Sequence, residues 1–283
     1  MSVPANIKAG PFTTLILLKK RYLIFYIFLI WITIFTIQFE FWLYWTLLYD
    51  WKYIHFLLFL PLLIFVLYIS SVIVSLFFAK VLLILVNLFH KPREGVFLRH
   101  ISDRDYRYWC IRSIIKKWPL WLAHKFPFPF LDNICFKAFG VKTKFSNSLF
   151  EGWVDTEFIE FGKNVVIGQA SVIQSAVIIG NLLIIRKTKI EDNARVGAHS
   201  IVMPGTHIGE NCILAGTSLT TIGQNLEEGW IYLGSPAKKL KKNLFFEDNL
   251  EEVLESQDID DEVLLKKYES LYTKRKDKEI KKK

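Results

Sequence analysis

The feature that most constrains this chain is a six-residue repeat between Phe161 and Leu219. A branched or aromatic apolar residue recurs at intervals of six, and in most repeats a small residue follows it. These pairs are Phe161-Gly162, Ile167-Gly168, Ile179-Gly180, Val196-Gly197, Ile208-Gly209 and Leu214-Ala215. An α-helix repeats its apolar face every 3.6 residues and a strand every 2, so a period of six is typical of neither.

A chain wound as a three-sided prism satisfies this period, with one short strand and one corner per hexad and three hexads per coil. The apolar residue then points inward and stacks on its equivalent in the next coil, and we expect glycine to let the corner adopt positive φ. The glycines up to Gly180 keep one phase and those from Gly197 onward another, so we expect a one-residue slip between Gly180 and Ile190. The pattern predicts about four to five coils.

The pattern [LIV]-G-x-x-[small]-x resembles that of the hexapeptide-repeat transferases, over residues 147–240. The resemblance implies an all-β, left-handed parallel β-helix in this part of the chain. It also implies a homotrimer, because a solenoid needs its neighbours stacked and its ends covered, and these transferases meet that need by packing as trimers.

Two long apolar stretches precede the repeat, at 22–40 and 54–79. At about 1.5 Å per residue the first spans roughly 27 Å, close to the thickness of a bilayer core. Glu40 then lies near the far interface, where the tryptophans and tyrosines that follow it form an aromatic belt. We therefore expect residues 1–90 to form a transmembrane α-helical hairpin.

Basic residues flank this hairpin at both ends, at Lys19-Lys20-Arg21 and from Lys80 through Arg99. The loop between the spans has only Lys52, beside Asp50. By the positive-inside rule, both termini and the β-helix face the cytoplasm of a cell with the hairpin in its inner membrane.

Residues 91–146 are basic and aromatic: 12 Lys or Arg against 4 acids fall between residues 91 and 144. The segment Ser102-Asp103-Arg104-Asp105 is expected to form the N-cap of a helix that ends before Pro119. We interpret the segment as lying in the headgroup layer of an anionic leaflet, or alternatively as lining an entrance for a phosphorylated lipid carrier. The pattern of residues 241–283 predicts an acidic linker, a C-terminal amphipathic helix and a basic tail.

The net charge of +9 accompanies 16% aromatic residues, which is unusual for a nucleic-acid-binding protein and natural for a membrane protein with basic flanks. We therefore expect no nucleic-acid partner. The three cysteines are too few and too scattered for a disulfide framework, and we expect them to be buried.

The family resemblance also locates a donor site. Gly234-Ser235-Pro236-Ala237-Lys238-Lys239 resembles the closing G-x-P-A-[KR] turn of the hexapeptide transferases, which approaches the adenosine end of coenzyme A. The resemblance implies that Gly234, Pro236 and Ala237 shape this turn and that Lys238 or Lys239 meets a phosphate. Acetyl-CoA or another acyl-CoA is the implied co-substrate.

Acyl transfer needs a general base, normally a histidine, near the acceptor's proton. In related sequences it lies in a segment resembling S-S-H-x-x-E-G, but here Ala176 takes the place of the histidine and Ile179 that of the glutamate. The remaining candidate is His199, which should face outward near a corner. The resemblance to the trimeric hexapeptide carbonic anhydrases does not extend to their three zinc-binding histidines, so no metal is predicted.

Two functions follow from these patterns. The first is a membrane-anchored acyltransferase that moves an acyl group from acyl-CoA to a hydroxyl or amine of a membrane-associated or lipid-linked acceptor. The hairpin plus prism loosely resembles the C-terminal membrane regions of polylysine-type peptide synthetases and some envelope-polysaccharide acetyltransferases. The alternative, which the missing histidine motivates, is a catalytically silent membrane trimer that binds a ligand or organises partners.

Overall fold

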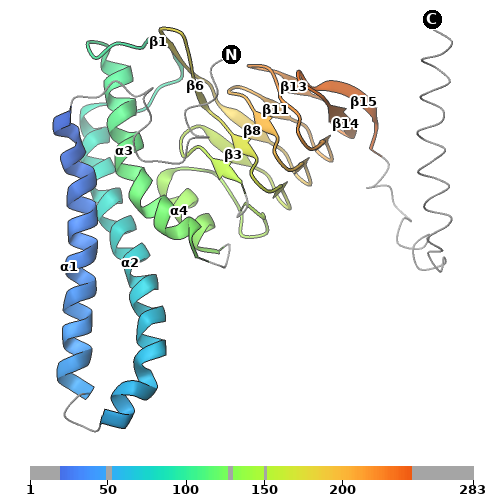
Figure 1. Cartoon of the computed structure of the whole chain (residues 1–283). Coiled ribbons are helices and arrows are strands. Elements are labelled where there is room, and N and C mark those ends of the chain that lie inside the picture. The colour runs from blue at the N-terminus through green and yellow to red at the C-terminus, as the bar shows by residue number, and fades with distance from the viewer. Residues whose placement is uncertain (1–19, 49–52, 127–129, 150–151, 244–283) are drawn as a thin grey trace, which may run out of the picture. The chain divides into compact units, whose positions relative to one another are not determined.

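This computed structural model describes residues 20–48, 53–126, 130–149 and 152–243 of the 283-residue chain. The chain divides into two compact units, Met1–Lys242 and Asn243–Lys283. All the helices and strands below belong to the first unit (Figure 1). The acidic linker, amphipathic helix and basic tail predicted near the C-terminus lie outside the described residues, as do residues 1–19.

Two long apolar helices follow a short 3₁₀ turn at Lys20–Tyr22: α1 (Leu23–Leu48) and α2 (Tyr53–Phe89). They run antiparallel, side by side (Figure 1). Most of their large apolar side chains are exposed. Both helices are long and apolar enough to cross a membrane, judged by length and composition alone.

Contacts between α1 and α2 hold the pair together. Phe28 and Phe78 meet edge to face with ring centroids 6.1 Å apart. Glu40, predicted near the far interface, accepts a hydrogen bond from the Ser70 hydroxyl of α2. The carboxyl group therefore turns toward the neighbouring helix.

Helix α3 (Arg104–His124) packs against both long helices. The Trp118 indole N–H donates to the Thr33 hydroxyl of α1 (3.1 Å). The Tyr68 hydroxyl of α2 donates to the Leu122 carbonyl (2.6 Å). The segment 91–146 is thus folded against the long helices rather than lying as a separate surface helix; its contact with lipid stays a prediction.

The start of α3 agrees with the sequence, and its end does not. Within the predicted N-cap segment it is Asp103 that caps the helix, by accepting from the Tyr106 N–H (3.0 Å). Helix α3 then continues through Pro119, where we expected it to stop, because Leu122 and Ala123 beyond the proline are buried in the core. Tertiary packing outweighs the one hydrogen bond that the proline removes.

The end of the second apolar helix also differs from the prediction. Helix α2 passes Lys80 without a break and ends at Phe89, because the residues after Lys80 are apolar. The Lys80 ammonium donates to the Ala138 carbonyl of α4 (Phe130–Phe139), which accommodates its charge.

The hexad region forms a parallel β-helix with three faces. Face 1 holds β2 (Trp153–Val154), β5 (Val172–Ile173) and β10 (Ile201–Val202). Face 2 holds β3 (Ile159–Phe161), β8 (Thr188–Ile190), β11 (His207–Ile208) and β13 (Asn225–Leu226). Face 3 holds β4 (Val166–Ile167), β9 (Arg195–Val196), β12 (Ile213–Leu214) and β14 (Trp230–Leu233).

The inward residues stack as predicted. On face 2, Ile190 pairs with Ile208 and Ile208 with Leu226, each one coil further along the chain, and all three are fully buried. A continuous apolar core joins this stack to the helices, from Leu29 of α1 to Leu226. The three cysteines are free and buried, as predicted. Fixed spacing and shared burial make each coil the support for the next.

The one-residue slip in phase that we predicted arises from an insertion into one coil. Phe161 pairs with Ile190 and Ile190 with Ile208, so the first of these two coils is longer than the second. The extra residues form a hairpin of β6 (Ala176–Ile179) and β7 (Leu182–Ile185), and β1 (Gly95–Leu98) adds a third antiparallel strand to it. Ile179, expected to point inward, is therefore 47% exposed.

Gly180, in the turn of the inserted hairpin, has the predicted positive φ (+58°), but the glycines between the coils have a different role. Gly168 and Gly197 do not have positive φ; the residues two positions later do, for example His199 at +56°. A Cβ on Gly197 would lie 2.3 Å from the Gly216 nitrogen of the next coil. The glycine is required because neighbouring coils approach too closely there for a side chain.

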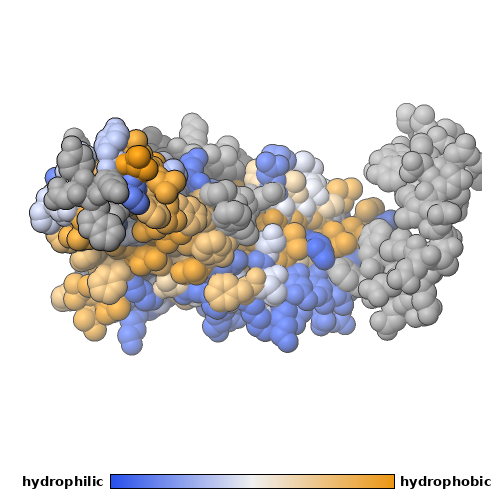
Figure 2. All heavy atoms as spheres, turned by 90° about the horizontal axis from the view of Figure 1, so that it is seen from below, coloured by the Kyte–Doolittle hydropathy of each residue, from blue (hydrophilic) through white to orange (hydrophobic). Residues whose placement is uncertain are grey.

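Polar and apolar surface are separated in this unit. Figure 2 shows apolar residues gathered over the long helices and hydrophilic residues along one side of the β-helix. On face 2 the outward side chains pair across coils, as when Glu160 meets Lys142 (2.5 Å) and Lys187 (2.8 Å). These pairs are on the surface. At the junction between α3 and the first coils, by contrast, ion pairs are buried.

Candidate functional site

One edge of the prism, the corner between face 3 and face 1, carries the residues predicted from sequence. We call it the closing edge, and it comprises residues 168–171, 197–200, 215–218 and the turn 234–237. A buried serine recurs along it, and its hydroxyl binds the following coil: Ser171 donates to the Gly197 carbonyl (2.8 Å) and Ser200 to the Ala215 carbonyl (3.0 Å). These bonds keep the coils in register along the edge.

The predicted closing turn ends this edge. Gly234 has φ +106°, in the region that favours glycine, and its N–H donates to the Ser218 hydroxyl (3.1 Å). The Ala237 N–H donates to the Leu219 carbonyl (2.7 Å). The peptide bond before Pro236 is cis. The turn leads into β15 (Lys238–Lys242), which runs antiparallel to β14 and covers the last coil.

The two lysines of the turn differ in their surroundings. The Lys239 ammonium lies 3.8 Å from the centre of the Trp230 ring and forms an ion pair with Glu227. Lys238 is exposed, and among the described residues it forms no ion pair. Of the two, Lys238 is the one with its charge available to a phosphate.

His199 lies on the same edge as the turn. It is exposed at the corner, and its N–H donates to the Gln169 carbonyl (2.8 Å) of the preceding coil. Two coils separate it from Ser235, about 10 Å at the roughly 4.8 Å spacing of neighbouring strands. No side chain within the described ranges hydrogen bonds to its ring, so the structure brings His199 near the turn without orienting its imidazole.

A second set of chemically suited residues lies where α3 meets the first coils. Here a cavity of about 80 Å³, which we call the junction cavity, opens between the helix and face 1. It is lined by Trp109, Ser113, Lys116, Lys117, Leu120, Trp153, Val154, Asp155, Thr156, Glu157 and Ser175. The sequence alone did not predict this site, because its two halves are far apart along the chain.

The base of the junction cavity is a buried charge cluster. The Arg112 Nε donates to Glu157 Oε1 (2.9 Å), and the Lys116 ammonium binds the same oxygen. The side chains of Arg112 and Lys116 are only 2% and 6% exposed. Burial alone raises the pKa of Glu157, but the two adjacent cations outweigh burial and lower it below its ordinary value. Glu157 is thus held ionised.

Asp155 is the second carboxyl group of the cavity. Its Oδ2 accepts from the backbone N–H groups of Ser175 (2.9 Å) and Ala176 (3.2 Å). Burial raises its pKa to about 6, although these hydrogen bonds and the Lys116 cation favour the ionised form. Ala176, at the place of the missing histidine, therefore binds an acid whose charge changes near neutral pH.

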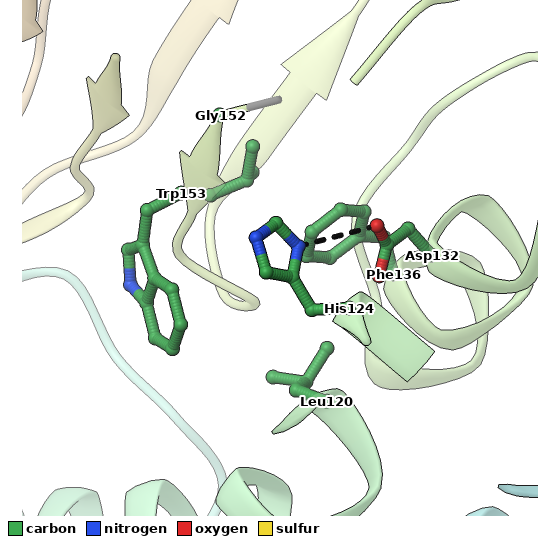
Figure 3. Close-up of a pocket in the computed structure, with 7 residues that line it drawn as sticks. Leu120, His124, Asp132, Phe136, Gly152 and Trp153 are labelled. Atoms are coloured by element: carbon green, nitrogen blue, oxygen red, sulfur yellow. Dashed lines mark hydrogen bonds and ion pairs between the residues drawn. The ribbon is translucent and has the colours of Figure 1, made fainter. Parts of the chain in front are cut away.

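A histidine–aspartate pair lies beside this cavity. His124 at the end of α3 has its Nδ1 3.3 Å from Asp132 Oδ2 of α4. The Asp132 side chain is 2% exposed and that of His124 is 38% exposed. Figure 3 shows the imidazole between Asp132 and Phe136 on one side and Trp153 on the other. Because an ionised carboxylate only accepts, Asp132 favours the tautomer with the proton on Nδ1.

The His124 pocket is the other end of the closing edge. Gly152 and Trp153 line this pocket, and the Trp153 N–H donates to the Ser171 carbonyl (2.7 Å), which places them one coil before Ser171 on that edge. Four coil steps separate this position from the turn at Gly234, about 19 Å at roughly 4.8 Å per step. His124 of α3 thus adjoins one end of the edge on which His199 lies.

Sequence signals for this second site are weak. His124 and Asp132 lie on either side of a helix boundary, and neither falls in a recognised motif. Lys116-Lys117 in an otherwise apolar stretch of helix was a usable signal, because a lysine on a buried face needs a partner. Among the described residues no group of three His, Cys, Asp or Glu side chains is arranged to hold a metal ion.

Comparisons with known proteins agree with the repeat. The family described as bacterial transferase hexapeptide (six repeats) matches residues 187–225, so this part of the chain consists of hexapeptide repeats. No curated protein matches the chain by sequence.

Several solved structures are similar to part of the chain. A mutant of AntD, an N-acyltransferase from Bacillus cereus in complex with coenzyme A and a dTDP-amino sugar, is 23% identical over 35% of this chain and 60% of its own, with a TM-score of 0.30. A maltose O-acetyltransferase from Clostridium difficile 630 is 18% identical over 40% and 75%, with a TM-score of 0.34. A galactoside acetyltransferase in complex with coenzyme A is 15% identical over 44% and 80%, also at 0.34.

The chain spans less than two thirds of the first two structures it matches, 60% and 64% of their lengths. Because the TM-scores of these structures lie below 0.5, only the residues of this chain indicate what it does.

Proposed function

We propose that this protein is a membrane-anchored, acyl-CoA-dependent acyltransferase. It transfers an acyl group to a hydroxyl or amine of a membrane-associated or lipid-linked acceptor at the cytoplasmic face of the cell membrane. The observation that carries the proposal is the closing edge, which joins the turn at Gly234, with the exposed Lys238, at one end to a His–Asp pair at the other. The left-handed winding, the homotrimer and the orientation in the membrane belong to the same proposal.

The donor lies along the closing edge in this proposal. Gly234 allows the backbone to approach the ligand, and Lys238 supplies a cation to its phosphates. An elongated molecule held at this turn directs its thioester along the edge, past His199 and toward the His124 pocket. Pro236 and Ala237 shape the turn. Lys239, which follows them, contacts Trp230 and Glu227 instead of the donor.

The base is His124, with Asp132 as the positioning residue. Asp132 holds the Nδ1 proton, so Nε2 accepts the proton of the acceptor's hydroxyl or amine. The acceptor oxygen or nitrogen then attacks the thioester carbonyl, the C–S bond breaks, and the coenzyme A thiolate leaves and is protonated. Of the two histidines on the edge, His124 has the buried carboxylate partner; His199 stays the base predicted from sequence.

The structure also offers a reason for locating the acceptor at the membrane. The His124 pocket lies at the end of α3 that contacts Thr33 and Tyr68 of the two long apolar helices. An acceptor held in a bilayer by its lipid chain approaches the pocket from that side. The relation to polylysine-type peptide synthetases remains a hypothesis that rests on this arrangement of helices and prism.

The first experiment is calorimetric titration of the detergent-solubilised full chain with acetyl-CoA and with coenzyme A. We expect binding of both. Absence of binding for both removes the acyltransferase and favours the alternative, a catalytically silent membrane trimer that binds a ligand or organises partners.

The second experiment assigns the base, using transfer of radiolabelled acetyl groups to a lipid extract. We expect His124→Asn to lower kcat/KM by about 10²–10⁴-fold, the usual contribution of a general base, with coenzyme A affinity retained. His207→Asn, on face 2 and 45% exposed in the side chain, is the matched control. Loss of turnover in His199→Asn with His124→Asn still active assigns the base to His199 instead.

A further inference from the structure

The junction cavity gathers buried cations that the proposed chemistry does not use. Lys116 and Lys117 line it together with Glu157 and Asp155, and Arg112, which binds Glu157, adds a third cation behind them. Burial of charged groups is costly unless each has a partner, because the interior screens charge poorly. The cations that act on the two acids come from α3: Arg112 and Lys116 bind Glu157, and Lys116 also acts on Asp155.

The cluster is not a closed structural network. Arg112 and Lys116 both bind Oε1 of Glu157, while its Oε2 has no hydrogen-bond partner among the described residues. A lysine ammonium has three donors, so Lys116 keeps donor capacity for a further acceptor. Lys116 also lines the cavity, so that capacity is available where a ligand would lie.

The volume and the lining residues of the junction cavity restrict which ligands it can bind. A cavity of about 80 Å³ is several times the minimum of roughly 10–15 Å³ that one water molecule needs. The indoles of Trp109 and Trp153 form apolar walls, and the hydroxyls of Ser113, Thr156 and Ser175 supply further polar contacts. An aromatic-lined site with a few polar groups fits a small headgroup with both flat apolar and polar surfaces.

We infer that the junction cavity binds a phosphate group carried on the acyl acceptor, with Lys116 and Lys117 as its cationic contacts. The role as acceptor site rests on the proposed function; the binding of phosphate does not. A lysine binds phosphate as a compact point charge with several donors. The cavity adjoins the His124 pocket through Leu120, Trp153 and Val154, which line both.

The position of the cavity favours a phosphate on a lipid over one on a soluble molecule. Helix α3, which supplies its lysines, packs on both candidate spans. Trp121, one turn beyond Lys117, is 51% exposed, and Phe130 at the start of α4 is 43% exposed. An exposed apolar margin beside a cationic cavity suits a ligand with an alkyl chain and a phosphate.

The carboxyl groups of the junction cavity affect how phosphate binding should change with pH. Asp155 interacts with the Lys116 cation of α3 and the neighbouring Glu157, and accepts hydrogen bonds from Ser175 and the Ala176 N–H. The pKa of Asp155 is raised to about 6 by burial, so its negative charge is present above that pH and opposes a second anion. Because a phosphate monoester gains its second proton near pH 6 as well, the contribution of Asp155 is read as the difference in phosphate affinity between the parent and Asp155→Asn across pH 5 to 7.

The experiment is calorimetric titration of the full chain in dodecyl maltoside micelles, without coenzyme A. The probes are inorganic phosphate, glucose 1-phosphate and dodecyl phosphate. Strongest binding of dodecyl phosphate supports a lipid-borne acceptor, and equal binding of glucose 1-phosphate supports the same phosphate site with a soluble source. Binding of none of the three at millimolar concentration overturns the inference.

Three variants identify the site. Lys117→Gln, which removes a half-buried cation, should weaken binding about five- to tenfold. Asp155→Asn should tighten binding at pH 7 and lose this advantage over the parent below about pH 6, where the parent's Asp155 is protonated, a pattern that a purely structural role does not predict. Lys189→Gln on face 2 is the control and should bind as the parent does. Unchanged affinity in both Lys117→Gln and Asp155→Asn places the phosphate elsewhere and refutes the inference.

Failure of this site and failure of the proposed function are distinguishable. Coenzyme A binding with no dodecyl phosphate binding refutes the cavity and leaves the transferase. Dodecyl phosphate binding without coenzyme A binding supports the cavity and refutes the transferase. Because coenzyme A carries phosphates itself, the titration is repeated with saturating coenzyme A; competition between the two refutes a separate acceptor site.

Discussion

The junction between α3 and the first coils and the outer surface of face 2 pair their charges in opposite ways. Glu157 and Glu160 are close neighbours in the chain and each meets two cations. The cations of Glu157 are 2% and 6% exposed, whereas Lys142 and Lys187, the partners of Glu160, are 75% and 43% exposed. Water competes for the second set and is largely excluded from the first.

This difference distinguishes the regular coils, which support the fold, from the junction, where we propose a binding site. The regular coils repeat with constant register, and their surface charges balance in pairs that contribute little. The junction breaks the repeat, takes its charges from a helix, and buries them next to a cavity. A charge cluster in that position costs stability unless its partners stay in place.

The largest expected effect is at Glu157. Glu157→Gln leaves Arg112 and Lys116 buried without a counter-charge, and we expect a loss of about 3–5 kcal/mol in the free energy of unfolding. Glu160→Gln on face 2 should lose only about 0–1 kcal/mol. Chemical denaturation of both variants in detergent measures the pair. Equal losses would mean that the two regions do not differ as described.

The next effect compares a buried side chain of the regular coils with an exposed one on the inserted hairpin. Ile208 is fully buried between Ile190 and Leu226, and Ile208→Ala should cost about 2–5 kcal/mol. Ile179 on the hairpin is 47% exposed, and Ile179→Ala should change stability by less than about 1 kcal/mol. The same denaturation experiment measures both variants. A loss of stability above about 1 kcal/mol in Ile179→Ala would indicate that Ile179 is buried in the core.

The third effect is a pH dependence that belongs to the junction. The pKa of Asp155 is about 6 in the folded protein and lower in the unfolded chain, so the folded state binds the proton of Asp155 more tightly. Stability relative to Asp155→Asn should therefore fall as the pH rises from about 4 to 6, by up to about 3 kcal/mol. Denaturation of both proteins at several pH values measures the difference. A constant difference across that range contradicts the raised pKa.

The smallest effect separates the two lysines of the closing turn. Lys238→Gln should weaken coenzyme A binding about fivefold, the value of about 1 kcal/mol for an exposed charge pair. Lys239→Gln should weaken it less, because Lys239 is already paired with Glu227 and lies over Trp230. Titration of the two variants checks the order, and a reversed order would place the donor's phosphates on the Trp230 side.

The sequence predicted the parts of the fold that repeat. The inward positions of Ile190, Ile208 and Leu214 follow from the hexad spacing alone, because coils that stack identically must place identical residues inside. The segment that caps α3, residues 102–105, was predicted for a similarly local reason, and the structure identified Asp103 within it. The closing turn at Gly234 was also found, since its motif is a continuous stretch of chain.

The tertiary structure decided whatever depends on residues distant in sequence. Ile179 fits the hexad grid, yet it lies on a hairpin because β1, from a much earlier part of the chain, pairs with β7 and draws the insertion out of the column. Helix α3 passes Pro119 because its last turn is buried against α2. The His124–Asp132 pair and the junction cavity arise in the same way. Periodicity reports which residues a coil buries, whereas a site depends on which distant side chains meet.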